Sequence, residues 1–160
     1  MMQTDVKSYR AAASGVATTN PVRLKNVTVT SATVSARNIA VADPTVSKSG
    51  TWSRTGTLVT VTINNNGLTN GQRVFLDVAG TAMRDGVYEV SNVATNTFTV
   101  TSATTGSATG TVTMYTNIYV ELDTFNTIGL PVLIPGEGIN CPNGIFVGVG
   151  SSVTATVYYG

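Results

Sequence analysis

The sequence predicts an all-β fold: an antiparallel, jelly-roll-like β-sandwich that carries an inserted small β-barrel or sandwich unit. Two observations lead to this prediction. The 160 residues include 28 Thr and 23 Val, a composition that favours strands over helices. Several segments alternate apolar and polar residues with the period of a half-buried strand, and none has the 3.6-residue period of a helix longer than about two turns.

The last segment of the chain shows the strand period most clearly. Apolar residues occupy every second position there, namely Val153, Ala155, Val157 and Tyr159. An apolar face of this kind needs a partner. We therefore expect the final strand to be buried by pairing with strands that precede residue 50.

The predicted base domain is discontinuous and comprises residues 21–50 and 117–160. Its first part offers two or three short strands and its second part four. Residues 1–50 hold six basic and two acidic side chains, whereas residues 117–160 hold three acids and no base. Because neither part can close a core alone and their charges are complementary, we expect them to fold together as one sandwich.

Residues 51–116 form the predicted insert, a series of hairpins. Asn66-Gly67 and Asn70-Gly71 are turn signals, and residues 85–100 are expected to form one hairpin. The expected core of the insert consists of alternating residues from its strands: Val59, Val61, Ile63, Val74, Leu76, Val78, Tyr88, Val90, Phe98 and Val100.

Residues 1–20 have small side chains without a sustained period, and they are predicted to form an extended arm with no partners in its own chain. Tyr9 and Arg10 suit a groove on a neighbouring subunit. The arm is therefore expected to become ordered on assembly.

Trp52 is the only Trp and precedes Arg54 at the expected junction between base and insert. It could stack on a sugar, but packing at the junction or a cation–π contact with Arg54 is the preferred interpretation. Together with Tyr9, Arg10 and Arg23, these two residues make up the predicted partner interface.

The side chains present argue against an enzyme. The chain has no His, so a Ser-His-Asp or Cys-His arrangement cannot be built, and no catalytic, cofactor-binding or metal-binding residue is predicted. Glu121 and Asp123 would share one face of a strand, where a solvated outer face explains them better than a hydrolase or calcium site. Cys141 is predicted to be a small buried apolar residue.

Charge and hydropathy bound the partners. Only 11% of the residues are charged and the net charge is +1, without the clusters of basic and aromatic residues that a nucleic-acid surface needs. No apolar run is long enough to span a membrane, and the first residues lack the apolar region of a secretory signal. We expect a protein made in the cytoplasm that binds neither nucleic acid nor membrane.

The end of the chain resembles the closing segment of small β-sandwich proteins of tailed-phage virions, which commonly read "IP-G-GI-C/F-NGLYV" and finish on "VTVFYG". The matching residues here are Ile134 to Gly136, Gly138, Ile139, Asn143 to Val147 and Val157 to Gly160. An early "R-L-x-x-V-x-V" strand, usual in such proteins, is matched by Arg23, Leu24, Val27 and Val29. These motifs are structural and cover about half of the chain.

The insert resembles a repeating unit of phage fibre and adhesion proteins. That unit reads loosely "VTVT-x-x-x-HGL-x-x-G-x-x-V", then "DGTYTV" and "TNTFTV", and this chain has "VTVTINNNGLTNGQRV", "DGVYEV" and "TNTFTV". Asn66 stands where His is frequent, which removes a metal or acid–base role at that position.

Both resemblances imply a non-enzymatic structural protein of a tailed-phage virion. The function expected from them is a capsid decoration or cement protein, made in the host cytoplasm and located in the virion. Its expected partners are the major capsid protein or another virion protein and further copies of itself, with a homotrimer favoured. The alternatives are a tail fibre, adaptor or other appendage protein, and a host-glycan-binding module.

Overall fold

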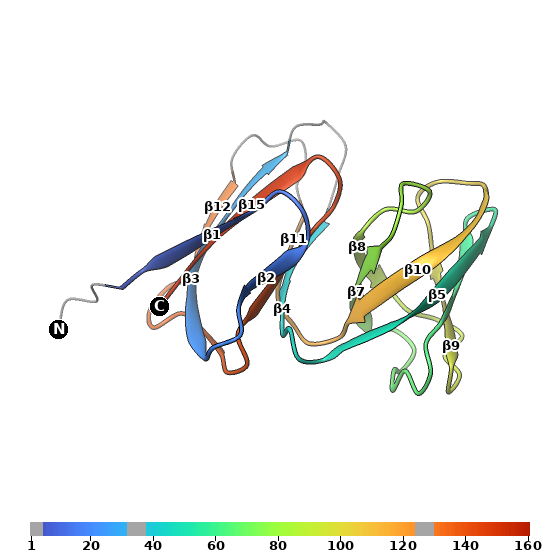
Figure 1. Ribbon diagram of the computed structural model, residues 1–160, viewed down its shortest axis with the longest axis horizontal. Coiled ribbons are helices and arrows are strands. Elements are labelled where there is room, and N and C mark those ends of the chain that lie inside the picture. Colours follow the sequence, from blue (N-terminus) through green and yellow to red (C-terminus); the bar gives the residue numbers. More distant parts are fainter. Residues whose placement is uncertain (1–4, 32–37, 124–129) are drawn as a thin grey trace.

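The computed structural model describes residues 5–31, 38–123 and 130–160. Every strand pairing in these residues is antiparallel, and they contain no helix. The predicted all-β fold class is therefore confirmed. Figure 1 shows two bodies side by side, one built from both ends of the chain and one built from its middle.

The first body is a sandwich of two sheets. The order of the first sheet is β1-β15-β3-β12, with β13 also paired to β3, and that of the second is β11-β4-β14-β2. The strands of the first sheet are β1 (Lys7–Ala11), β3 (Val22–Ser31), β12 (Leu130–Leu133), β13 (Ile139–Cys141) and β15 (Val153–Tyr159). The strands of the second sheet are β2 (Gly15–Thr18), β4 (Asn38–Ala42), β11 (Ile118–Asp123) and β14 (Ile145–Val149).

The strand order is that of a jelly roll. Each strand of the first part of the chain pairs with a strand of the last part: β1 with β15, β2 with β14, β3 with β12 and β13, and β4 with β11. The first and last parts thus form one long hairpin that is rolled into two sheets. The middle of the chain leaves from the tip of this hairpin, between β4 and β11.

The final strand is buried as its sequence predicts. Val153, Ala155, Val157 and Tyr159 all lie in the core of the sandwich. They face the core together with Leu24, Val27 and Val29 of β3, the central strand with which β15 pairs. Cys141 is also fully buried in this core, and burial raises the pKa of its thiol to about 11.

The prediction of an N-terminal arm without partners in its own chain is wrong for residues 7–18. β1 pairs along its whole length with β15, and β2 pairs with β14. Ala11 is fully buried in the sandwich core, although small residues without a sustained period surround it in sequence. β1 and β2 are strands that the two sheets need at one edge, so tertiary pairing overrides a weak local pattern.

The second body is a single six-stranded sheet of order β8-β7-β10-β5-β6-β9. Its strands are β5 (Ser47–Thr55), β6 (Leu58–Thr62), β7 (Arg73–Val78), β8 (Gly86–Glu89), β9 (Thr97–Thr101) and β10 (Ser107–Tyr115). The sheet curls so far that its two end strands, β8 and β9, approach each other. Ser91, which follows β8, and Thr99 of β9 exchange two backbone hydrogen bonds of 2.9 and 2.8 Å. The result is a nearly closed barrel around an apolar core.

Three details of the insert and base differ from expectation. The barrel sheet begins at Ser47 rather than at residue 51. The hairpin expected over residues 85–100 is formed only at its turn end, where Ser91 and Thr99 pair. β8 itself pairs with β7, and β9 with β6. β13 was not expected as a strand. Independent folding of sandwich and barrel stays a prediction. The sequence also predicts a strand through Val34, which lies outside the described residues.

Candidate functional site

The contact between sandwich and barrel is the first candidate site. Ala40 and Ala42 of β4 and Phe146 of β14 pack there against Phe75 of β7 and Val87 of β8. β4 and β14 are therefore covered on both faces, by the sandwich core on one side and by the barrel on the other. We call this contact the seam.

Three aromatic rings hold the seam. The rings of Tyr115 and Phe146 are stacked, with centroids 3.7 Å apart and planes 11° apart. Phe75 meets Phe146 edge-on at 5.9 Å. Gly148 leaves room for this arrangement, since a Cβ there would lie 2.5 Å from the ring of Phe75. Such pairs add to the free energy of burial, so the seam is interpreted as a structural contact between the two bodies.

One ion pair crosses the edge of the seam. The guanidinium of Arg73 in β7 donates to both carboxylate oxygens of Glu121 in β11, with Nε 2.8 Å from Oε2. The hydrogen bond to Glu121 is the main reason that the pKa of Arg73 is raised. Arg73 is nearly half exposed, so the pair contributes at most about 1 kcal/mol to stability. Glu121 thus has a partner in the barrel, rather than the solvated position expected for it.

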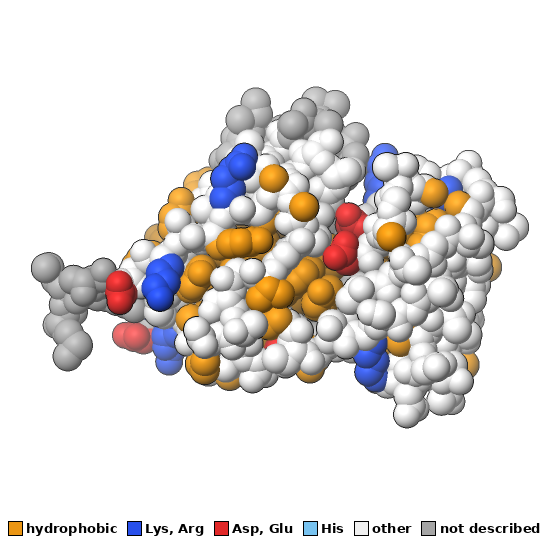
Figure 2. Space-filling view, in the orientation of Figure 1, with side chains coloured by type: hydrophobic (Ala, Val, Ile, Leu, Met, Phe, Trp, Pro, Cys, Tyr) orange, Lys and Arg blue, Asp and Glu red, His pale blue; other side chains and the backbone are white. Residues whose placement is uncertain are grey.

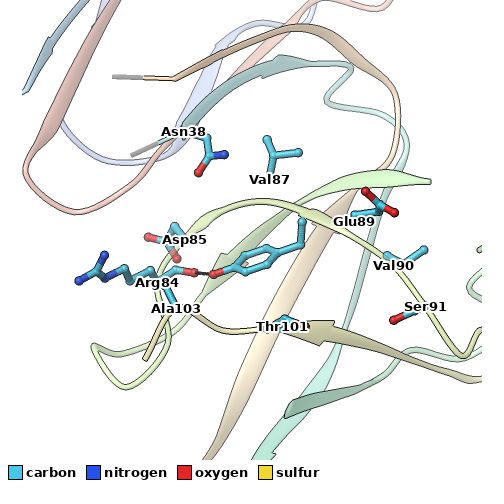
Figure 3. Close-up of a pocket in the computed structure, with 10 residues that line it drawn as sticks. Asn38, Arg84, Asp85, Val87, Glu89, Val90, Ser91, Thr101 and Ala103 are labelled. Carbon is cyan, nitrogen blue, oxygen red and sulfur yellow. Dashed lines mark hydrogen bonds between the residues drawn. The ribbon is translucent and has the colours of Figure 1, made fainter. Parts of the chain in front are cut away.

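A pocket of about 470 Å³ opens beside the seam, between β8 and the end of β9 (Figure 3). Asn38 of the sandwich forms one side of it. The other lining residues belong to the barrel: Arg84, Asp85, Val87, Tyr88, Glu89, Val90, Ser91, Thr101 and Ala103. The pocket lies where the barrel wall is incomplete, next to the backbone bridge between Ser91 and Thr99.

The polar groups of this pocket are partly fixed. Oδ1 of Asp85 accepts a 2.7 Å hydrogen bond from the backbone N–H of Val78, and the hydroxyl of Tyr88 donates a 2.6 Å hydrogen bond to the carbonyl oxygen of Arg84. Burial raises the pKa of Asp85 to about 6 and that of Tyr88 to about 12. Figure 3 shows the guanidinium of Arg84 pointing away from Val87 and Glu89. The pocket therefore presents carboxyl groups and backbone to a ligand.

The predicted interface residues do not come together. Arg10 is exposed on β1, and Tyr9 beside it is half-buried against the sandwich core. Arg23 is exposed on β3 and donates a 3.4 Å hydrogen bond to the carbonyl oxygen of Gly138. These three residues belong to one sheet of the sandwich, whereas Trp52 and Arg54 belong to the barrel.

The prediction that Trp52 and Arg54 contact a partner is wrong. Trp52 is 2% exposed in the barrel core, and its indole lies over Gly110, where a Cβ would be 2.8 Å from Nε1. Arg54 is 7% exposed, and its guanidinium donates to the hydroxyls of Ser102 and Thr104 and to the Thr104 carbonyl. Both side chains point into the barrel because they share the inner face of β5. Trp52 therefore lies away from the seam and makes no cation–π contact with Arg54.

Sequence reasoning missed the seam residues. The expected core positions Val74, Leu76 and Val78 do face the barrel core, but Phe75 between them was not assigned a contact. The signal was the absence of alternation: residues 74–76 are all apolar, as in a strand that is buried on both faces. The same holds for β14, in which all five residues are buried.

Comparisons with known proteins give no relative: no family model, no curated protein and no solved structure matches the chain. Within the described residues, no group of three or more His, Cys, Asp or Glu side chains is placed to hold a metal ion. No helix that could cross a membrane is found in the same part of the chain.

Proposed function

We propose that this chain is a non-enzymatic structural protein of a tailed-phage virion and that it decorates the capsid. The observation that carries the proposal is the jelly-roll strand order, an architecture that viral capsid proteins use repeatedly. Because one fold serves many functions, the proposal also rests on the resemblance of both chain ends to virion β-sandwich proteins and of the barrel to fibre repeats.

The edge formed by β1 and β2 is the best candidate for the contact with another virion protein. Each of these strands ends a sheet, so one side of its backbone has no strand partner among the described residues and can pair with another chain. Val6 and Val16 are 54% and 46% exposed there, and Lys7 and Arg10 add exposed positive charge. Figure 2 shows apolar side chains gathered over the sandwich, whereas the barrel surface in this view is mostly polar. An acidic, partly apolar groove on a capsid subunit would match this edge.

Several copies of a weak contact would be enough to hold the protein on the capsid. A homo-oligomer, with a trimer as the expected form, would present the same edge several times to a symmetric shell. Each added contact then binds at the high effective concentration set by the first. The barrel would lie next to this edge, because it packs on the sheet that contains β2, and Val16 of β2 pairs with the seam residue Phe146.

Within the described residues no aromatic side chain is exposed, which gives no support to the glycan-binding alternative. A sugar platform needs an exposed aromatic ring, and the only Trp is buried in the barrel core. Tyr115, Phe75 and Phe146 are used in the seam.

The deciding experiment is a copy number from quantitative mass spectrometry of purified virions. Hundreds of copies per particle support decoration of the head, and a dozen or fewer would move the protein to the tail. Absence from the particle would overturn the proposal.

Binding to undecorated heads tests the edge itself. Arg10→Glu should weaken binding by about tenfold, since it places an acid in an acidic groove. Arg84→Glu makes the same charge change on the barrel and should bind as the wild type does. Equal binding by both variants would reject the β1 and β2 edge as the contact.

A further inference from the structure

The barrel wall has an open slot between β8 and β9. These are the two end strands of the six-stranded sheet, and two backbone hydrogen bonds between Ser91 and Thr99 join them at one point only. Beyond that bridge the two strands separate, and the pocket of about 470 Å³ occupies the space between them. This volume lies within the range of ordinary ligand pockets.

The backbone of β8 faces this slot with unused hydrogen-bonding groups. Successive residues of a strand direct their N–H and C=O groups to opposite sides. Ser91 directs its groups to β9, whereas Val90 directs its groups to the neighbourhood of β7, where its N–H donates to Gln72. By the same alternation Glu89 and Val87 turn their N–H and C=O groups toward the slot.

No strand within the described residues takes up these groups. The ladder that begins at Ser91 and Thr99 does not continue to Glu89 and Thr101, and both of these residues line the pocket instead. An unpaired strand edge of this kind is a template for one more strand. Main-chain hydrogen bonds from an added peptide would supply affinity there, and side-chain contacts would supply selectivity.

The charge of the slot determines which kind of peptide it can bind. Asp85 and Glu89 line it, and neither forms an ion pair with a described residue. Arg73, opposite Glu89 on β7, is paired with Glu121 instead. The remaining charged lining residue, Arg84, points its guanidinium away from Val87 and Glu89 (Figure 3). A Lys or Arg side chain on the added strand would find carboxylates at the slot, whereas an acidic side chain would be repelled.

We propose that the slot between β8 and β9 binds an extended segment of a partner protein that carries Lys or Arg, as a strand added along Val87 and Glu89 of β8. The site is separate from the β1 and β2 edge and does not depend on the proposed role in the virion. It can be tested on the isolated full-length chain.

The first test uses synthetic peptides and hydrogen exchange. The probe is a peptide of six residues, with a Lys at each end and alternating Val and Thr between them. It is compared with a peptide that has Glu in place of both Lys residues, and with a Lys peptide that is N-methylated at alternate residues. The Lys peptide should slow exchange at the amides of Val87 and Glu89, and leave those of Tyr88 and Val90 unchanged. The other two versions should bind at least about tenfold more weakly.

The second test uses variants of Glu89. Glu89→Pro removes an N–H that the barrel does not use, so it should spare the fold and weaken binding by about tenfold. Glu89→Gln keeps the N–H and should reduce only the preference for Lys over Glu peptides. Glu137→Gln, which removes an exposed carboxylate on the sandwich, is the matched control and should bind as the wild type does.

Each result bears on the proposal. Trp52 is buried in the barrel core, so its fluorescence reports whether the barrel of Glu89→Pro is intact. If that variant unfolds, the N-methylated peptide carries the same test without any change to the protein. Equal binding by the N-methylated and unmodified peptides, or no protection of Val87 and Glu89 at millimolar peptide, would overturn the proposal.

Discussion

The side-chain amide of Asn143 donates a 2.8 Å hydrogen bond to the carboxylate of Asp43, 100 residues earlier in the chain. Asp43 is 1% exposed and lies where the chain leaves β4 for the barrel. Its other oxygen accepts hydrogen bonds of 2.9 and 2.7 Å from the backbone and hydroxyl of Thr45. Its backbone N–H donates to the carbonyl oxygen of Asn117, where the chain returns. Asp43 thus connects the exit of the chain, its return and the turn before β14.

Asp43→Ala should lower the free energy of unfolding by on the order of 3 kcal/mol, because it leaves several buried donors without an acceptor. Chemical denaturation at pH 7 measures this loss. Asp5→Ala removes an exposed carboxylate and is the matched control, expected to remain within about 0.5 kcal/mol of the wild type. A loss for Asp43→Ala no larger than for the control would show that the hydrogen bonds of Asp43 add nothing to stability.

Asp43 also gives the stability a dependence on acid pH. Burial alone would raise the pKa of its carboxyl, but the hydrogen bonds from Asn143, Thr45 and Asn117 together hold it below 3.8. A folded-state pKa below the unfolded value stabilises the fold above pH 4, and this contribution is lost as the pH falls through the folded-state pKa. The cost of Asp43→Ala should therefore shrink below pH 4. A cost independent of pH from 7 down to 2.5 would contradict this.

Asp85 should act in the opposite direction. Burial raises the pKa of its carboxyl to about 6, so its contribution is fully present below pH 4 and is lost as the pH rises through about 6. Asp85→Asn keeps an oxygen to accept from the N–H of Val78 and removes the charge. Relative to the wild type, the variant should gain on the order of 1 to 2 kcal/mol between pH 4 and pH 7.

Denaturation at a series of pH values checks this prediction. Thr81→Asn adds an amide to the same loop at an exposed position and should differ from the wild type by the same amount at every pH. If Asp85→Asn also shows a constant difference, the buried carboxyl of Asp85 does not control the pH dependence.

The strands could be predicted from the sequence because alternation is a local property. Val59 and Val61, or Val157 and Tyr159, show their buried face within a few residues. Which strands become neighbours is a property of the whole chain. β8 pairs with β7 rather than with β9, so the hairpin expected over residues 85–100 is limited to the bridge between Ser91 and Thr99.

The same reasoning explains the errors made for Trp52 and Arg54 and for the N-terminal segment. A rare Trp beside an Arg suggests a surface contact, but the inner face of β5 is set by six strands that curl around it, and this places Trp52 and Arg54 inside. Small residues around Ala11 gave no strand signal, although β15 holds that segment in register. The slot at Glu89 could not be predicted, because it depends on backbone groups that carry no side-chain signature.

The strand role of β1 can be tested with two neighbouring alanines. Ala11→Asp buries an unpaired carboxylate in the sandwich core and should cost several kcal/mol, enough to lose soluble expression or cooperative melting. Ala12→Asp places the same group at an exposed position and should melt within a few degrees of the wild type. If both variants melt at the same temperature, residues 7–11 are not a strand of the sandwich core, and the prediction of an N-terminal arm would hold for them.

The rolled hairpin predicts that the sandwich folds without the barrel. The backbone N–H of Asp43 donates a 2.9 Å hydrogen bond to the carbonyl oxygen of Asn117, so these residues already face one another as the last pair of a hairpin does. Replacing residues 44–116 by Asn-Gly should join β4 and β11 through a two-residue turn. The product should melt cooperatively, because β15 and the core around it remain complete.

The replacement exposes the seam face of β4 and β14, with Phe146 at its centre. We therefore expect self-association, which Phe146→Thr in the same variant should relieve, because a polar β-branched residue suits a solvated strand face. Circular dichroism melting and size-exclusion chromatography measure both effects. If no cooperative transition appears even with Phe146→Thr, the sandwich needs the barrel to fold, and the seam is part of one core rather than a contact between two.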